Sequence, residues 1–85
     1  MNMQTVELTP QQIADLREIG EPLGEARRDL AVGREPCVSH TPNGREIRLV
    51  LGGFALQPRN DNYWITVASI DDAMDAYENP ARYRD

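Results

Sequence analysis

The chain is organised around residues 45–69, which read REIRLVLGGFALQPRNDNYWITVAS. Within this stretch, apolar and polar side chains alternate on both sides of a loop rich in Pro, Asn and Asp. Because successive side chains of a β-strand point to opposite sides, such alternation is typical of antiparallel strands that bury one face. We therefore expect an antiparallel sheet here, with the flanking helices packed on its apolar face.

The alternation also predicts which strand residues point toward the helices. Arg48 and Trp64 fall on the opposite face of the sheet, because they alternate with the apolar positions. The residues expected on the buried face are Ile47, Leu49, Ile65 and Val67.

Three strands can be placed directly from turn and loop signals. Residues 35–40 form a short strand, and residues 41–44, which read TPNG, predict a tight turn. A strand over residues 45–51 follows that turn. Residues 63–68 make the last strand of the sheet.

The glycine pair at residues 52–53 leaves the strand count open. It is either a two-residue hairpin turn that pairs Val50 with Ala55, or a bulge in one long strand that ends at residue 57. The sheet therefore has three strands or four.

Two helices are expected before the sheet. Thr9 can accept a hydrogen bond from a free backbone amide, Pro10 suits the first helical position, and Gln12 can complete a capping box. Residues 20–22, which read GEP, interrupt the helical pattern, and a second helix covers residues 22–31. The alternative is one long helix that is kinked at the proline.

A third helix follows the sheet. Ser69 and Asp72 form a capping box at its start, and Pro80 ends it, leaving residues 81–85 as a tail. The inward-facing residues expected from the three helices are Ile13, Leu16, Ile19, Leu23, Ala26, Leu30, Ile70, Ala73, Met74 and Tyr77.

Together these segments predict an α+β fold with two N-terminal helices, an antiparallel three- or four-stranded sheet and one C-terminal helix. The 85 residues correspond to a single small domain, residues 1–85. Residues 1–8 are expected to be a loose arm or a short edge strand.

Charge is distributed unevenly along the chain. The net charge is −5, and all nine basic residues are arginines. Residues 1–25 and 60–85 are acidic, whereas residues 26–59 are basic. Because nucleic acids and anionic membranes attract proteins largely through their phosphates, the acidic balance disfavours both as direct partners. It permits a basic protein surface as a partner.

Acidic residues of the C-terminal helix form the sharpest pattern in the sequence. They are Asp71, Asp72, Asp75 and Glu78. Their spacing is that of a helix surface and does not match a calcium-binding loop. They form either a solvated helix face or a stripe that docks on a basic surface. A second candidate stripe in the N-terminal helices contains Asp15, Glu18, Glu21 and Glu25.

Basic and aromatic residues gather around the predicted sheet, in particular Arg48, Tyr63 and Trp64. Arginine and aromatic side chains on an open sheet can stack on nucleic-acid bases. The same residue types are frequent hot spots of protein interfaces. The alternative is that a helix covers Trp64.

The remaining motifs lack residues that a metal site or a phosphate-binding loop would need. Cys37 and His40 have the spacing of half a zinc site, but the sequence holds no second Cys or His. No Lys and no helix start follow the glycine pair at 52–53, as a phosphate-binding loop would need. We therefore expect no enzymatic activity, no cofactor and no metal. One unpaired cysteine and the lack of a signal peptide or apolar span predict a cytoplasmic protein.

In length, acidic balance and lack of catalytic motifs, the chain resembles small acidic proteins of phages and mobile elements, anti-CRISPR proteins among them. The resemblance covers composition and not individual residues, so no site is carried over from it. It implies a protein-binding inhibitor that blocks a nucleic-acid-handling host complex by presenting carboxylates in place of phosphates. The alternatives are a small structural or adaptor protein, and an RNA- or DNA-binding module that uses the Arg/aromatic face. We expect a monomer or a homodimer.

Overall fold

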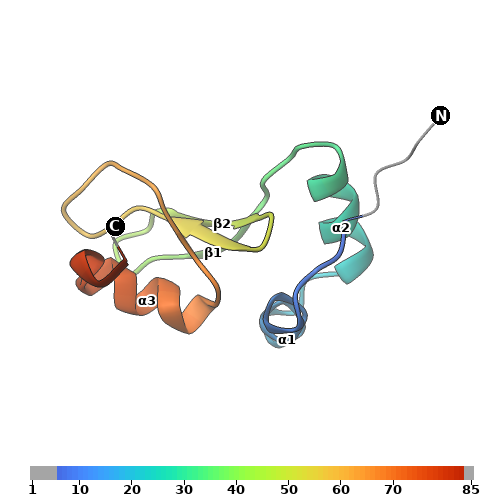
Figure 1. Cartoon of the computed structure of the whole chain (residues 1–85), viewed down its shortest axis with the longest axis horizontal. Helices are drawn as coiled ribbons and strands as arrows, with labels where there is room; N and C mark the ends of the chain where they lie inside the picture. The colour runs from blue at the N-terminus through green and yellow to red at the C-terminus, as the bar shows by residue number, and fades with distance from the viewer. Residues whose placement is uncertain (1–5, 84–85) are drawn as a thin grey trace.

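Three α-helices and a four-stranded sheet make up residues 6–83, the part of the chain that the computed structural model describes (Figure 1). The elements are α1 (Pro10–Ile19), α2 (Leu23–Ala31), β1 (Cys37–His40), β2 (Glu46–Val50), β3 (Gly53–Leu56), β4 (Ile65–Val67), α3 (Ile70–Glu78) and the 3₁₀ helix η1 (Pro80–Tyr83). The predicted α+β class is confirmed, with four strands rather than three.

The strands form a meander, in which each strand pairs with the next one along the chain. The order across the sheet is β1-β2-β3-β4, and all three pairs are antiparallel. A β-bulge interrupts the β1–β2 ladder between Cys37 and Ser39. Figure 1 shows α1 and α3 below the strands, on the same side of the sheet.

Tight turns join β1 to β2 and β2 to β3, whereas residues 57–64 join β3 to β4. Between β1 and β2, the Thr41 N–H donates to the Arg45 carbonyl at 2.8 Å, and Gly44 has a φ of +85°. Between β2 and β3, Leu51 and Gly52 form a two-residue turn in which Gly52 has a φ of +81°. Both glycines therefore stand where a side chain would strain the backbone.

The pairing of β2 with β3 differs from the prediction by two positions. Val50 pairs with Gly53, whereas Ala55 lies opposite Arg48. Only the first glycine of the pair belongs to the turn, and the second is a strand residue. Gly53 is needed for another reason, because a Cβ there would collide with the Val67 carbonyl oxygen of β4. The close approach of β3 and β4 thus depends on a missing side chain.

The N-terminal helices are separate, so the interpretation as one kinked helix is wrong. The predicted capping box is present: the Gln12 N–H donates to the Thr9 hydroxyl at 3.0 Å, and the Gln12 side chain accepts from the Thr9 N–H at 2.9 Å. The first helix ends at Gly20, which has a φ of +92°. The second begins at Leu23, one residue later than predicted, because Pro22 is the cap residue.

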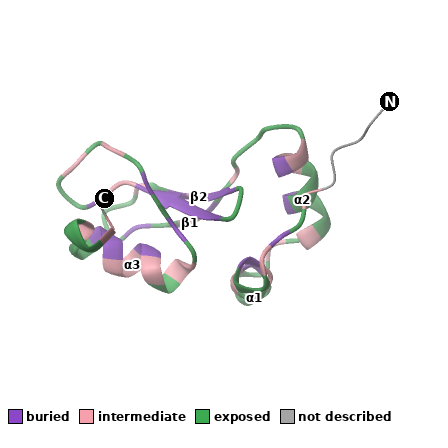
Figure 2. Cartoon of the chain, viewed as in Figure 1, coloured by how far each residue is buried: buried purple, intermediate pink, exposed green. Residues whose placement is uncertain are grey.

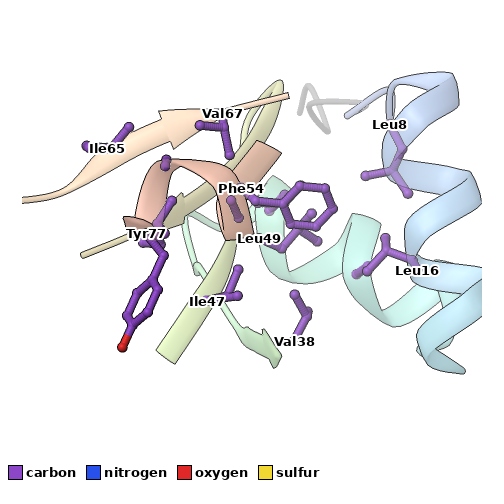
Figure 3. Close-up of a cluster of buried hydrophobic side chains, with 14 residues drawn as sticks. Leu8, Leu16, Val38, Ile47, Leu49, Phe54, Ile65, Val67 and Tyr77 are labelled. Carbon is purple, nitrogen blue, oxygen red and sulfur yellow. The ribbon is translucent and has the colours of Figure 1, made fainter. Parts of the chain in front are cut away.

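Side chains from one face of the sheet and from all three α-helices form the core, which Figure 3 shows in close-up. The residues predicted on the buried face of β2 and β4 are buried, whereas all four residues of β3 are buried, and Figure 2 shows how burial runs along the chain. The expected core positions that are buried include Leu16, Ala26, Leu30, Ile47, Leu49, Ile65, Val67, Ala73 and Tyr77. Phe54, Leu56 and Ala76 are fully buried as well. Burial of each large apolar side chain stabilises the fold by about 1.5–3 kcal/mol.

Some helical positions are less buried than expected. Ile13 and Met74 are half-buried and pack against the edge of the core. Ile19, at the end of α1, is 39% exposed, so its prediction as a core residue is wrong.

Gln12 is a polar residue in the centre of the fold. Its side chain is fully buried, and its amide nitrogen donates to the carbonyls of Val50 at 2.8 Å and Gly53 at 3.0 Å. These two carbonyls flank the β2–β3 turn. The capping residue of α1 therefore also holds the helix against the hairpin.

The chain after α3 is not a simple tail, contrary to the prediction for residues 81–85. Residues 80–83 form η1, which packs back against α3, while residues 84–85 lie outside the described part. The predicted arm or edge strand at residues 1–8 is described only from Val6, and there it contains no strand. Within the described residues, no helix is both long enough and apolar enough to span a membrane.

Candidate functional site

The acidic residues predicted on α3 divide into two groups with different surroundings. At the C-terminal end, the Asp75 carboxylate accepts a hydrogen bond from the Tyr83 hydroxyl at 2.7 Å and lies 3.1 Å from Arg82. The Asn79 side-chain amide also donates to Asp75, at 3.1 Å. Asp75 therefore fastens η1 to α3 and is not a free carboxylate.

These contacts change the acidity of both partners. The hydrogen bond from Tyr83 lowers the pKa of Asp75 below its usual value of 3.8, and Asn79 and Arg82 act in the same direction. The same hydrogen bond raises the pKa of Tyr83 to about 12. Glu78, one turn further on, lies 3.6 Å from Arg59 with both side chains exposed. An exposed pair of this kind contributes little to stability.

The N-terminal end of α3 is different, because α1 meets it there. One oxygen of the Asp15 carboxylate accepts a hydrogen bond from the Ile70 N–H at 3.0 Å. The other oxygen accepts from the Gln11 side chain at 3.1 Å. Asp15 thus accepts a hydrogen bond from a backbone amide that has no partner within α3, and its charge interacts favourably with the helix dipole.

This contact joins the two predicted acidic stripes, which are far apart in the sequence. A shallow hollow of about 210 Å³ lies between the helices and is lined by Asp15, Glu18, Ile19, Ile70 and Asp71. We call this set the acidic hollow. Glu18 and Asp71 are exposed, while Asp72 is half-buried on the adjacent side of α3.

The chemistry of the acidic hollow suits a long basic side chain. Its lining combines two apolar side chains, Ile19 and Ile70, with three carboxylates. Lysine and arginine bury their aliphatic stems on apolar surface while their charged heads stay with polar partners. An arginine can also form paired hydrogen bonds with a carboxylate.

A second exposed feature lies on the face of the sheet that the helices leave open. Trp64 is 44% exposed, so the interpretation that a helix covers it is wrong. The guanidinium of Arg48 stacks over the Trp64 ring, 4.6 Å from its centroid, and Arg48 also pairs with Glu46 at 2.9 Å.

The same face carries a hollow of about 390 Å³, which we call the sheet hollow. Its lining residues are Glu35, Arg48, Val50, Leu51, Ala55, Trp64 and Thr66. Tyr63, which was predicted to belong with Arg48 and Trp64, is half-buried and packs against the core cluster instead. Arg48 and Trp64 are thus stacked on each other, whereas Tyr63 packs against the core cluster.

Cys37 and His40 lie close together on β1. The Cys37 sulfur is 3.7 Å from Nε2 of His40, and both residues are exposed. Residues three apart in a regular strand point to opposite faces, so the bulge between Cys37 and Ser39 accounts for this contact. Within residues 6–83, no group of three or more candidate metal ligands comes together.

No protein family, curated protein or solved structure was found to match this chain. Its function is therefore inferred from the chemistry of the acidic hollow and of the sheet hollow.

Proposed function

We propose that this chain is a small acidic, non-enzymatic protein-binding module that inhibits a nucleic-acid-handling protein complex. The observation that carries the proposal is the acidic hollow, which carboxylates from two helices line together with a pair of isoleucines. Such a site offers an arginine or lysine of the target the negative charge that a phosphate would otherwise supply.

Rigidity supports this role. Asp15 is held by two hydrogen bonds, one of them to the backbone of α3. α3 itself begins with a capping bond from the Asp72 N–H to the Ser69 hydroxyl at 3.0 Å. Because the carboxylates stand on two capped helices, little conformational entropy is lost when a partner docks.

Charge supports the choice of partner. The net charge of −5 attracts a basic surface and repels nucleic acid itself. We place the action of the protein in the cytoplasm, where a single unpaired cysteine stays reduced. The similarity in composition to anti-CRISPR proteins favours a phage or mobile-element origin. Neither a cofactor nor a metal takes part in this proposal.

The first test measures binding of an arginine-rich peptide at low salt by fluorescence anisotropy. The variant combines Glu18→Arg with Asp71→Arg, which removes two carboxylates of the acidic hollow but leaves the capping residue Asp15 in place. The control combines Glu7→Arg with Glu25→Arg, two exposed acids outside the hollow. Both variants carry the same net charge. We expect the hollow variant to bind at least about tenfold more weakly than the control, or about 1.4 kcal/mol. Equal loss in both variants would show that only net charge matters.

A second test identifies the kind of target. The protein is used to capture partners from a bacterial lysate, with and without nuclease treatment. A basic protein that is retained after nuclease treatment, and that the hollow variant fails to retain, supports the proposal. Capture that requires intact nucleic acid would instead favour the RNA- or DNA-binding alternative.

A further inference from the structure

Cys37 and His40 are the only cysteine and the only histidine of the chain, and the structure brings their side chains together. Sγ of Cys37 lies 3.7 Å from Nε2 of His40, and both residues are exposed on β1. The Cys37 thiol also donates to the Ser39 carbonyl at 3.3 Å, within the bulge. Thiolate sulfur and imidazole nitrogen are common zinc ligands. One exposed surface of β1 therefore carries two side chains of the type that zinc binds.

The distance between the two atoms matches one coordination geometry. With a Zn–S bond of about 2.3 Å and a Zn–N bond of about 2.0–2.1 Å, a tetrahedral angle at the metal separates sulfur from nitrogen by about 3.6 Å. The same bonds give about 3.1 Å at a right angle and about 4.4 Å in a linear arrangement. The observed 3.7 Å is closest to a tetrahedral centre, which is the geometry of structural zinc sites.

A tetrahedral centre needs four ligands, and one chain supplies two of them. Within residues 6–83, no third candidate ligand joins Cys37 and His40. Glu46 lies opposite His40 in the β1–β2 ladder, but its carboxylate is bound to Arg48 at 2.9 Å. Two copies that each contribute one Cys and one His complete the Cys₂His₂ set of structural zinc sites. The site is therefore incomplete without a second copy.

Strand β1 stands where a second copy can reach it. It is the first strand of the sheet and pairs with β2 alone, so its outer side has no strand neighbour within the described residues. Unpaired sheet edges readily pair with another chain. If two β1 strands pair antiparallel about a twofold axis between Val38 and Ser39, Cys37 of each copy lies opposite His40 of the other. Twofold symmetry then brings two equal pairs of ligands to one metal on the axis.

We propose that Cys37 and His40 from two copies of this chain bind one zinc ion, which joins the copies as a symmetric dimer through β1. On binding, each Cys37 thiol releases its proton to the solvent, and each neutral His40 ring coordinates through Nε2. The two thiolates balance the charge of Zn²⁺, so the centre is neutral. This inference does not depend on the proposed function.

The test adds zinc chloride to the metal-free protein in a phosphine reductant, which prevents a disulfide between two Cys37 side chains. Competition with a chromophoric chelator gives the zinc affinity and stoichiometry, and sedimentation velocity gives the mass. We expect one zinc ion per two chains, a monomer that becomes a dimer with zinc, and a return to monomer when a strong chelator is added. Cobalt in place of zinc should show the visible absorption of tetrahedral thiolate coordination.

Two variants remove the ligands. Cys37→Ser and His40→Gln should each weaken zinc binding at least about tenfold and prevent the zinc-dependent dimer. Glu46→Gln is the matched control, because it changes an exposed carboxylate opposite His40 without altering either ligand. It should bind zinc and dimerise like the parent. Circular dichroism checks that all three variants fold.

Four outcomes would overturn the inference. Zinc could bind at one ion per chain with no change in mass, so that no second copy completes the site. Cys37→Ser could bind zinc as tightly as the parent, which would place the ion elsewhere. Glu46→Gln could lose as much affinity as His40→Gln, which would make the carboxylate a ligand. The dimer could form equally well in the presence of the chelator.

Discussion

The two faces of the sheet are built from the same strands but have different chemistry. On the helix side, Ile47, Leu49 and Phe54 are fully buried and contribute to one core. On the open side, Arg48 and Trp64 line the sheet hollow together with the small residue Ala55, which pairs with Arg48 across the β2–β3 ladder. The alternation of the strands thus puts fully buried side chains on one face and the stacked Arg48–Trp64 pair on the other. Substitutions on the helix side should therefore lower the free energy of unfolding more than substitutions on the open side.

The largest expected effect is on the helix side. Leu49→Ala should lower the free energy of unfolding by about 2–5 kcal/mol, because it removes a fully buried side chain and leaves a cavity. Trp64→Ala on the open side should cost less, because that ring is already partly exposed. Urea denaturation monitored by circular dichroism measures both. A larger loss for Trp64→Ala than for Leu49→Ala would contradict the separation of the two faces.

A smaller effect is expected where helix α1 meets the hairpin. Gln12→Ala leaves the carbonyls of Val50 and Gly53 without their buried donor, so we expect a loss of about 1–3 kcal/mol. The neighbouring Gln11→Ala is the matched control, because Gln11 is exposed and bonds only at the surface. Its effect should stay within about 0.5 kcal/mol. Similar losses in the two variants would mean that the buried hydrogen bonds of Gln12 contribute little to stability.

The smallest effect concerns the contact between α3 and η1. Because the pKa of Asp75 is lowered in the folded protein, its stabilising contribution is present above the usual value of 3.8 and is lost as the pH falls below it. The pKa of Tyr83 is raised to about 12, so the same contact is present below the usual value of 10.0 and is lost as the pH rises toward 12.

Asp75→Asn tests this contact through the titration of Tyr83. The substitution removes the negative charge next to the hydroxyl, so the pKa of Tyr83 should move back toward 10.0. Nuclear magnetic resonance of the Tyr83 ring follows the change. Glu78→Gln is the control, because Glu78 pairs with Arg59 and not with Tyr83. An unchanged Tyr83 pKa in Asp75→Asn would show that η1 is held by other contacts.

Strand faces and helix starts could be predicted because they depend on neighbouring residues. The alternation around Leu49 and Ile65 placed both in the core, and the capping box of Thr9 and Gln12 is present. The register of the β2–β3 hairpin was wrong because the two glycines look alike in sequence. Only the passage of β4 beside Gly53 distinguishes the strand glycine from the turn glycine.

Binding surfaces were harder to predict, because they depend on residues distant along the chain. The acidic residues of α3 were noted in the sequence. The hydrogen bond from the Tyr83 hydroxyl to Asp75 was not predicted, because the last residues were expected to form a tail. Leu51 was treated as a strand residue and proved to be the exposed tip of a turn. Ile19 was expected in the core and lines the acidic hollow instead.

By itself, the sequence determined the α+β class, the inward faces of β2 and β4 and the ends of the helices, because period and capping act over a few residues. Only the tertiary structure decided which carboxylates remain free. The bond between Asp15 and the Ile70 N–H joins groups 55 positions apart, and no local pattern encodes it. It exists because α1 and α3 pack on the same face of the sheet, which brings a carboxylate to the unpaired amides at a helix start.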